Sequence, residues 1–281
     1  MSLPAILDHI VINARFNMDD AEDLFSRMGF KLTPRGRHTM GSINHLMMFA
    51  DDYLELIGIG EADADKRPDV SQAPLGLNGL VFKTENADQA FERLGDNGMA
   101  GGPPRAFSRP LVLDDGSRHE AAFRTATARS DAFPAGRLYF CEHLTPELLW
   151  RAEWLSHPNG VTGFTELMTV CANPDEDAER VGALLAIAAD SAREDAPQIA
   201  FASGFRLTFV TPEAYSDRFG DLAVSTTGRD ACFGALGLRC ENPEALFAAL
   251  EDCGDAVTVA RQDASAVVLV QAFDTLLRFD F

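Results

Sequence analysis

Apolar runs of strand length alternate with amphipathic segments along the chain, and four segments repeat the same order. Each opens with an apolar run, reaches an Asn and continues with apolar positions at helical spacing. The segments read LDHIVINARFNMDDAEDLF, LNGLVFKTENADQAFERL, FTELMTVCANPDEDAERV and ALGLRCENPEALFAAL. Their shared residues, at intervals of 69, 87 and 69, are Asn17, Asn86, Asn173 and Asn242. Two equal intervals around a longer one predict two similar domains of two modules each.

The recurring Asn predicts a helix N-cap, where its side-chain oxygen accepts a backbone N–H that the first turn leaves free. Pro174 and Pro243 follow two of these residues, at a helical position where a missing N–H costs little. Acidic residues in the first turns complement the helix dipole: Asp19, Asp20, Asp88, Asp175, Glu176 and Glu244. We therefore expect four capped helices.

Further strands follow each predicted helix. INHLMMF and YLELIGI form a predicted hairpin around the turn 50–52, and GRLYFCEHL and TLLRFDF read as last strands of later modules. Each module thus reads as strand, helix and about three strands. Pro, Trp and Asn-Gly signals place a linker at 144–162, between an N-terminal domain 1–143 and a C-terminal domain 163–281.

Composition narrows the partners and the location. The 281 residues carry 43 acidic and 24 basic side chains, a formal net charge of −19 that repels nucleic acid and anionic membranes. No apolar stretch is long enough for a bilayer, and the opening residues lack the basic region of a secretory signal. The five cysteines form no CxxC pair. We expect a cytoplasmic protein with buried thiols that acts on a small molecule.

The order of elements resembles that of the glyoxalase-like branch of the vicinal oxygen chelate superfamily. The motifs LDHIVINA, RMGFKLTPRGRH, MGSINHLMMF, DYLELIGIG, HLTPELLW and HPNG carry the resemblance over nearly the whole chain. It implies an α+β fold of two domains, each a pair of βαβββ modules whose mixed sheet curls into a cup. It also implies a divalent metal on His and Glu side chains. Activities in the superfamily include isomerisation, ring cleavage by dioxygenases and metal-free sequestration of the bleomycin-resistance type, so the fold alone names no reaction.

All six histidines precede residue 158, so we expect the polar chemistry in the N-terminal domain. The resemblance implies that His9 is the metal ligand of the first strand and Glu55 the carboxylate ligand of the last strand. The repeat alignment places Gly79, Glu166 and Ala235 where the first module has His9. Imidazole with carboxylate suits Zn, Fe, Mn or Ni. A hydrogen bond between buried His and Glu side chains is the competing interpretation.

The third ligand, or a proton-transfer group, is left open between His45, Glu142 and His143. With a three-residue hairpin turn, His45 shares a sheet face with Glu55, although a shift of one residue would reverse this. Adjacent strand residues face opposite sides, so only one of Glu142 and His143 enters the cup, and the family pattern favours His143. The alternative is that Glu142 caps a turn and His143 packs on Trp150.

Two basic loops could guide an anion to the cup, although solvated loops are the favoured interpretation. One contains His38 with Arg35 and Arg37, and the other contains Arg105 and Arg109. Phosphate-binding glycine loops and a GxSxG elbow are absent, which disfavours nucleotide chemistry and serine hydrolysis.

Two functions follow from the predicted site. One is a metal-dependent lyase, isomerase or dioxygenase acting on a small oxygenated metabolite in the N-terminal domain. The alternative is a metal-free protein that binds or sequesters a small molecule. A third hypothesis is a degenerate domain pair whose C-terminal half serves only packing or the contact of a homodimer. In each case we expect no metal centre in the C-terminal domain, which has no His.

Overall fold

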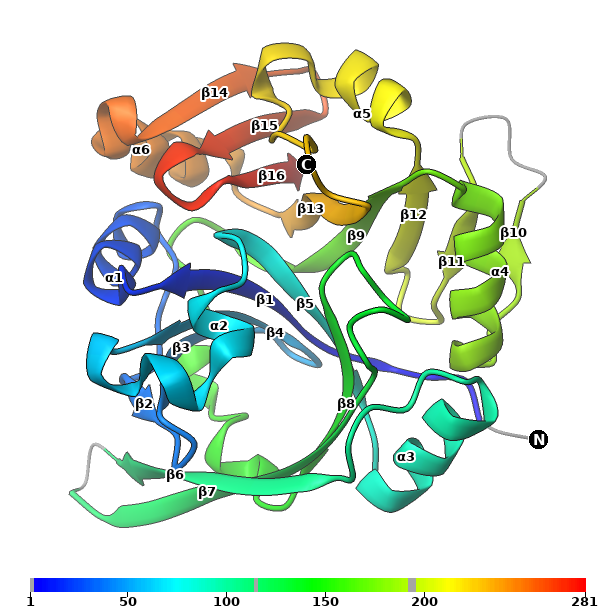
Figure 1. Cartoon of the computed structure of the whole chain (residues 1–281). Coiled ribbons are helices and arrows are strands. Elements are labelled where there is room, and N and C mark those ends of the chain that lie inside the picture. Colours follow the sequence, from blue (N-terminus) through cyan, green and yellow to red (C-terminus); the bar gives the residue numbers. More distant parts are fainter. Residues whose placement is uncertain (1–2, 114–115, 192–195) are drawn as a thin grey trace.

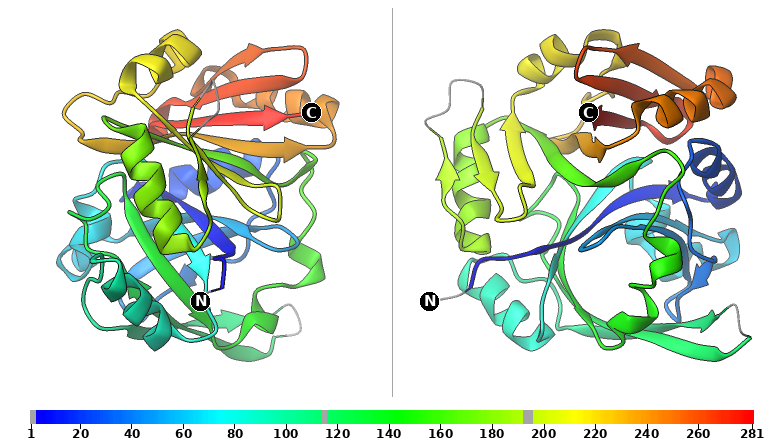
Figure 2. Two further views of the ribbon diagram at one scale, coloured as in Figure 1. Left: turned by 90° about the vertical axis from the view of Figure 1, so that its right-hand side faces the viewer. Right: turned by 180° about the vertical axis from the view of Figure 1, so that it is seen from behind.

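The computed structural model describes residues 3–113, 116–191 and 196–281, which form two eight-stranded mixed sheets (Figure 1). The strand orders are β2-β3-β4-β1-β5-β8-β7-β6 and β10-β11-β12-β9-β13-β16-β15-β14, the same arrangement twice. The first sheet curls until it is nearly closed, and the second is more open (Figures 1 and 2). The predicted α+β fold of two glyoxalase-like domains is confirmed.

The N-terminal sheet is built by two modules. The first contains β1 (Leu7–Arg15), α1 (Met18–Arg27), β2 (Gly36–Arg37), β3 (Ser42–Met48) and β4 (Tyr53–Ile59). The second contains β5 (Gly76–Lys83), α3 (Ala87–Asp96), β6 (Arg105–Val112), β7 (Arg118–Thr127) and β8 (Arg137–His143). A short segment with α2 (Pro68–Ser71) connects them. Each module has the predicted order of strand, helix and three strands.

The C-terminal sheet repeats this plan. Its first module contains β9 (Val161–Cys171), α4 (Pro174–Leu185), β10 (Ala189–Asp190), β11 (Gln198–Ala200) and β12 (Arg206–Val210). After α5 (Pro212–Phe219), the last module contains β13 (Ala231–Cys240), α6 (Pro243–Cys253), β14 (Val257–Arg261), β15 (Ser265–Val270) and β16 (Thr275–Asp280). None of the described helices is long and apolar enough to cross a membrane.

The helix starts differ from the prediction at two of the four Asn residues. Asn86 and Asn242 accept backbone N–H groups as expected of N-caps. Asn17 and Asn173 stand at the same position without a side-chain cap bond. The backbone of Asn17, at φ −103° and ψ 37°, lies outside the extended region that directs a capping oxygen toward the first turn.

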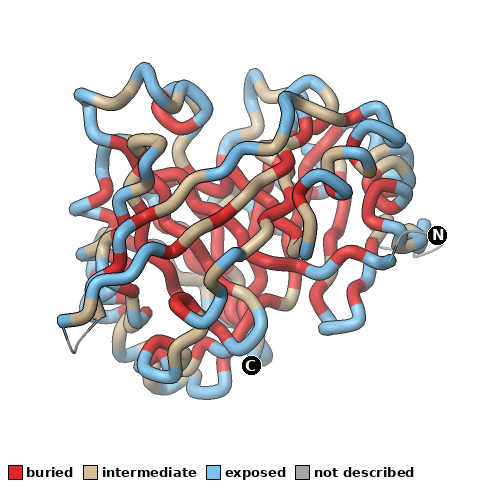
Figure 3. The backbone as a smooth tube through the Cα atoms, turned by 90° about the horizontal axis from the view of Figure 1, so that it is seen from below, coloured by how far each residue is buried: buried red, intermediate tan, exposed pale blue. Residues whose placement is uncertain are grey.

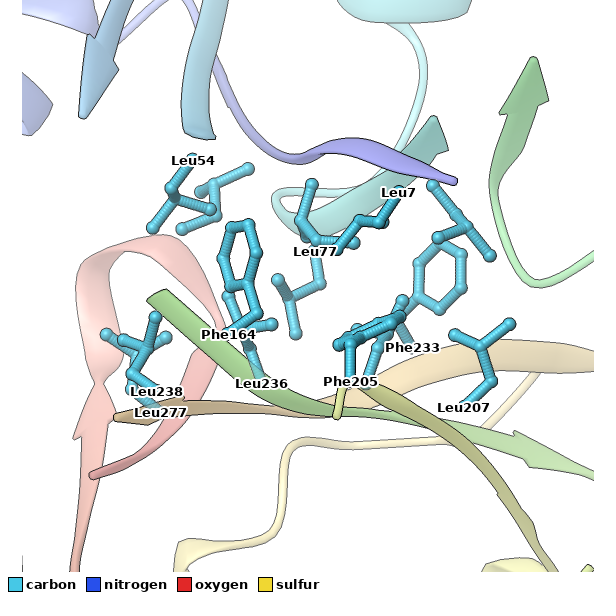
Figure 4. Close-up of a cluster of buried hydrophobic side chains, with 14 of the residues drawn as sticks. Leu7, Leu54, Leu77, Phe164, Phe205, Leu207, Phe233, Leu236, Leu238 and Leu277 are labelled. Atoms are coloured by element: carbon cyan, nitrogen blue, oxygen red, sulfur yellow. The ribbon is translucent and has the colours of Figure 1, made fainter. Parts of the chain in front are cut away.

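The two sheets share one apolar core. Figure 4 shows Leu7, Leu54 and Leu77 of the N-terminal sheet facing a layer of the C-terminal sheet that includes Phe164, Phe205, Leu236 and Leu277. Side chains alternate along each strand, so the other face of the N-terminal sheet is turned into its own curl. The buried interior runs through both halves, and exposure is concentrated in the connections (Figure 3). The five cysteines are free and buried.

Candidate functional site

The curl of the N-terminal sheet encloses a cavity of about 560 Å³. Its wall is formed by strands from both modules and by the segment around α2. Among the lining residues are His9 of β1, Asn44 of β3, Glu55 of β4 and Tyr139 of β8. Two predicted site residues, His9 and Glu55, therefore meet in one cavity.

An irregularity in β1 brings Asp8 to His9. The register with β5 shifts between Leu7 and His9, so Asp8 is an extra residue in the strand. Such a bulge redirects side chains: Leu7 packs in the core between the sheets, while His9 lines the cavity. The carboxylate of Asp8 is fully buried and bonds Nδ1 of His9 at 2.7 Å and Nε2 of His143 at 2.9 Å.

The Asp8 carboxylate fixes the orientation of His9. Burial alone would raise the pKa of Asp8, but the imidazoles of His143 and His9 hold that pKa well below its usual range. An ionised carboxylate only accepts hydrogen bonds, so His9 donates from Nδ1. A neutral His9 then carries a lone pair on Nε2, directed into the cavity.

Nε2 of His9 faces two oxygen atoms. The hydroxyl of Tyr139 lies 3.0 Å away and Oε2 of Glu55 3.7 Å away. Burial raises the pKa of Tyr139 well above its ordinary value, and the charge of Glu55 raises it further. The phenol therefore keeps its proton and can donate a hydrogen bond to Nε2 of His9. The ring of Tyr53 stacks on His9 at 4.3 Å between centroids.

Asn44 is the second partner of Glu55. Its Nδ2 donates to Oε1 of Glu55 at 2.6 Å, and both side chains are buried. We predicted a buried carboxylate that needs a partner, but we did not predict this partner. Asn44 lies in the same hairpin, one residue from the position that we selected.

The predicted hairpin register is wrong by one residue. Leu46 opposes Glu55, and His45 opposes Leu56. The loop begins one residue earlier than expected, because the N–H of Phe49 bonds the carbonyl of Asp52 at 2.8 Å. Since side chains alternate, this shift turns His45 to the opposite face of the sheet.

His45 is therefore separated from Glu55. Its Nδ1 bonds the carbonyl of Thr33 at 2.8 Å, and its Nε2 lies 3.0 Å from Glu22 and 3.1 Å from Nε of Arg35. These partners belong to α1 and the segment after it. The structure does not place His45 in the cavity.

Glu142 and His143 face opposite sides of β8. Glu142 accepts the N–H of Ala87 at the start of α3, outside the cup. His143 points inward, bonds Asp8 and packs its ring edge-on against Trp150 at 5.1 Å. It does not line the cavity. The ligand atoms of Asp8, Cys141 and His143 lie within 4.8 Å of one another, which makes this group a second candidate metal centre.

The repeat explains which side chains meet in each cup. In each module the first strand pairs in parallel with the last strand. The residue two places after the equivalent of His9 always lies opposite one residue of that last strand. These opposed residues are Glu55, Tyr139, Thr208 and Arg278. In the C-terminal half, Glu166 bonds Thr208 at 2.5 Å and lies 3.0 Å from Arg278. A buried ion pair thus occupies the place that His9 and Tyr139 hold in the N-terminal half.

The donor set fits a divalent ion with few protein ligands. His9 has a carboxylate behind its other ring nitrogen, as metal-binding histidines usually do, and Glu55 adds an anionic oxygen. The second module supplies no comparable ligands. Its equivalent of His9 is Gly79, where a Cβ would stand 2.6 Å from Val11, so no side chain fits there. Its equivalent of Glu55 is Tyr139, which holds a protonated phenol. The remaining coordination would fall to the oxygen atoms of a bound molecule.

Positive charge gathers around the cavity although the chain is strongly acidic. The lining contains six basic and two acidic side chains: Lys66, Arg67, Arg105, Arg109, Arg129, Arg137, Glu55 and Asp69. Burial, together with Arg109 and Arg67, lowers the pKa of His38 to about 3, so this lining ring is neutral. A local cationic excess in a chain of net charge −19 favours an anionic ligand. The prediction of solvated loops is wrong for Arg105 and Arg109, which lie on β6, and both line the cavity together with His38.

The sequence model of the glyoxalase-like domain family matches residues 7–185. A hypothetical protein from Staphylococcus aureus has a similar structure, with a TM-score of 0.64, 10% identity and 98% of each chain covered. A mutant of 4-hydroxymandelate synthase from Streptomyces coelicolor has a TM-score of 0.60 and 13% identity, over 99% of this chain and 92% of that one. A xylose isomerase-like TIM barrel/4-hydroxyphenylpyruvate dioxygenase fusion protein has a TM-score of 0.56 and 13% identity, over 99% of this chain and 49% of that one. No curated protein sequence matches the chain.

Proposed function

Because the chain belongs to the glyoxalase-like domain family of the vicinal oxygen chelate superfamily, we propose that its N-terminal cup acts on a small oxygenated anion, with a divalent ion held by His9 and Glu55. The reaction class would be that of an isomerase, a lyase or a dioxygenase. The observation that carries the proposal is the arrangement of Asp8, His9 and Glu55. Asp8 leaves the Nε2 lone pair of His9 facing the Glu55 carboxylate inside the cavity.

Each side chain has a chemical role in this proposal. The ion, when bound, would polarise two neighbouring oxygens of the substrate and stabilise negative charge that develops on them. Asp8 fixes the ring of His9, and Asn44 fixes the carboxylate of Glu55. Tyr139 holds a proton beside Nε2 of His9 and can donate a hydrogen bond to a substrate oxygen. The cationic wall attracts the anion.

One observation favours a second function, metal-free binding or sequestration. Both oxygens of Glu55 already face a polar partner, Asn44 for one and His9 for the other. Glu55 therefore has a hydrogen-bond donor in Asn44 without an ion, and the arginines around the cavity repel a cation.

A titration separates the two functions. Zn, Mn, Ni and Fe(II) would be added to metal-stripped protein, with binding followed by calorimetry, Fe(II) under anaerobic conditions. We expect His9→Ala and Glu55→Gln to weaken binding at least tenfold, because each removes one of two protein ligands. His45→Ala is the matched control, since it removes an imidazole from the same sheet on the opposite face. If the native protein binds no metal, or if both site variants bind as well as it does, sequestration replaces the metal proposal.

Cobalt(II) absorption of the metal-stripped native protein distinguishes the two candidate metal centres. Cobalt(II) bound to a thiolate gives a near-ultraviolet charge-transfer band that a His and carboxylate site lacks. We expect no such band, because burial raises the pKa of Cys141 well above its usual value and the neighbouring Asp8 raises it further. A band that disappears in Cys141→Ser would move the metal to Asp8, Cys141 and His143.

A further inference from the structure

Arg109 is a buried cation that forms no ion pair with any of the described residues. It lies on β6, lines the cavity and is only 1% exposed. Its Nε and Nη2 have no hydrogen-bond partner among the described residues. Guanidinium stays protonated inside proteins, and a buried charge with no partner is costly. An arrangement that leaves these two donors free in a cavity wall points to a ligand that completes them.

The two free atoms form the edge that holds carboxylates elsewhere in this chain. Arg67 binds Asp69 with Nε at 2.8 Å and Nη2 at 2.7 Å. Arg278 binds Asp280 with the same two nitrogens, at 2.7 and 2.9 Å. These parallel donors match the two oxygens of a carboxylate. Arg109 lines the cavity, and none of the described carboxylates bonds this edge.

The surrounding residues place the guanidinium beside the candidate centre. A Cβ on Gly36 would lie 2.4 Å from Nη1 of Arg109 and 2.3 Å from Oδ1 of Asn44, so only glycine leaves room for both. Asn44 in turn bonds Glu55. The charge of Glu55 acts on Arg109 from a distance, but its carboxylate accepts from Asn44 and forms no direct ion pair with the guanidinium among the described contacts.

An aromatic pair lines the same cavity as Arg109. Phe107 is two residues from Arg109 on β6 and therefore on the same face of the strand. Its ring stacks with that of Phe123 at 5.2 Å, and His38 packs edge-on against it at 5.2 Å. A flat apolar group would find a complementary surface here.

We infer that the Nε and Nη2 edge of Arg109 binds the carboxylate of a small aromatic or other flat apolar acid, which packs against Phe107 and Phe123. The remaining polar groups of that acid would then reach Glu55 and His9. This last step rests on the proposed function, whereas the binding of the carboxylate does not.

The test uses benzoate as the probe, with benzamide as its uncharged counterpart and inorganic phosphate as the competing oxyanion. Calorimetry and thermal unfolding would be run on the metal-stripped protein. We expect saturable binding of benzoate and a raised Tm, with neither effect from benzamide or phosphate. Arg109→Met should weaken benzoate binding about tenfold or more, since it removes both charge-assisted hydrogen bonds.

Stability without ligand separates a binding residue from a structural one. Arg109→Met removes an unpaired buried charge, so its Tm should equal or exceed that of the native protein. Arg278→Met is the matched control: it removes the cation nearest to Glu166 and the one bound to Asp280, and should lower Tm. If Arg109→Met lowers Tm as much as Arg278→Met, or if benzoate binds both equally, the inference is overturned. Arg109-dependent binding of phosphate alone would overturn the carboxylate assignment.

Failure of the metal proposal would be visible separately. Glu55→Gln should still bind benzoate, because the anion contacts Arg109, and Arg109→Met should still bind metal. Loss of metal binding in the native protein with intact benzoate binding refutes the metal site alone. The reverse result refutes the inference alone.

Discussion

At the scale of single residues, the cup is governed by which buried charges have partners. Asp8 bonds two imidazoles, and Glu55 accepts a hydrogen bond from Asn44. Nε and Nη2 of Arg109 have no hydrogen-bond partner in the part of the chain that the structure describes. Satisfied groups rigidify a site, whereas an unsatisfied buried group calls for an explanation, which for Arg109 is the ligand inferred above.

Asp52, in the β3–β4 loop, gives a test of these electrostatics by pH. Its Oδ1 is buried and has no hydrogen-bond partner among the described residues. Burial raises the pKa of this carboxyl from 3.8 to about 7, although Lys83 opposes the shift. Between these values the folded state binds a proton that the unfolded state has released. Asp52 therefore lowers the free energy of unfolding as pH rises from about 4 to about 8.

We expect Asp52→Asn to remove this pH-dependent fall in the free energy of unfolding. Relative to the native protein, the variant should gain about 1 to 2 kcal/mol in unfolding free energy between pH 5 and pH 8, a value reduced for screening by water. Urea unfolding at both pH values measures it, with the exposed neighbour in Asp51→Asn as the control. A gain that does not change with pH would show that Asp52 ionises normally.

At the scale of elements, small irregularities decide which side chains enter the cup. The bulge in β1 inserts Asp8 as an extra residue beside His9. The early start of the β3–β4 loop places Asn44, and not His45, on the face of the sheet that carries Glu55. Each is a change of one residue in a strand whose side chains alternate, so each reverses a face.

The repeated Asn residues give a test at this scale. Asn86 accepts the N–H groups of Asp88 and Gln89, whereas Asn17 makes no cap bond. Asn86→Ala should therefore cost about 1 kcal/mol in unfolding free energy, and Asn17→Ala less than about 0.5 kcal/mol. Urea unfolding of the two variants compares equivalent positions of one repeat. Equal costs would mean that the cap bond of Asn86 contributes nothing.

At the scale of the whole molecule, the halves depend on a common core. Aromatic contacts cross between the sheets: Phe49 packs edge-on against Phe164 at 5.3 Å, and Phe82 stacks on Phe201 at 5.9 Å. Apolar side chains of both halves belong to the same buried cluster. Two domains that share their core lose its stabilisation together.

We therefore expect a single cooperative unfolding transition. Phe164→Ala should lower the unfolding free energy by about 3 to 5 kcal/mol. It should shift the midpoint of the unfolding transition equally when that transition is followed by tryptophan fluorescence and by far-ultraviolet circular dichroism. Tryptophan fluorescence reports the segment that follows the N-terminal sheet, since Trp150 and Trp154 are the only tryptophans, and far-ultraviolet circular dichroism reports the whole chain. Separate midpoints for the two probes would show that the halves unfold independently.

Local pattern was enough for the order of elements, the fourfold repeat and the strand positions of His9 and Glu55. Periodicity, turn residues and repeat spacing are properties of neighbouring residues, so a sequence displays them directly. The absence of His from the second half was equally visible.

Only the tertiary structure decided which side chains share the cup. Asn44, Tyr139, Asp8 and Arg109 come from four strands, and their meeting depends on registers, a bulge and the curl of the sheet. Alternation along a strand has a period of two, so an error of one residue moves a side chain through the sheet, as it did for His45. Strand pairing over long sequence separations sets that parity, and local pattern does not contain it.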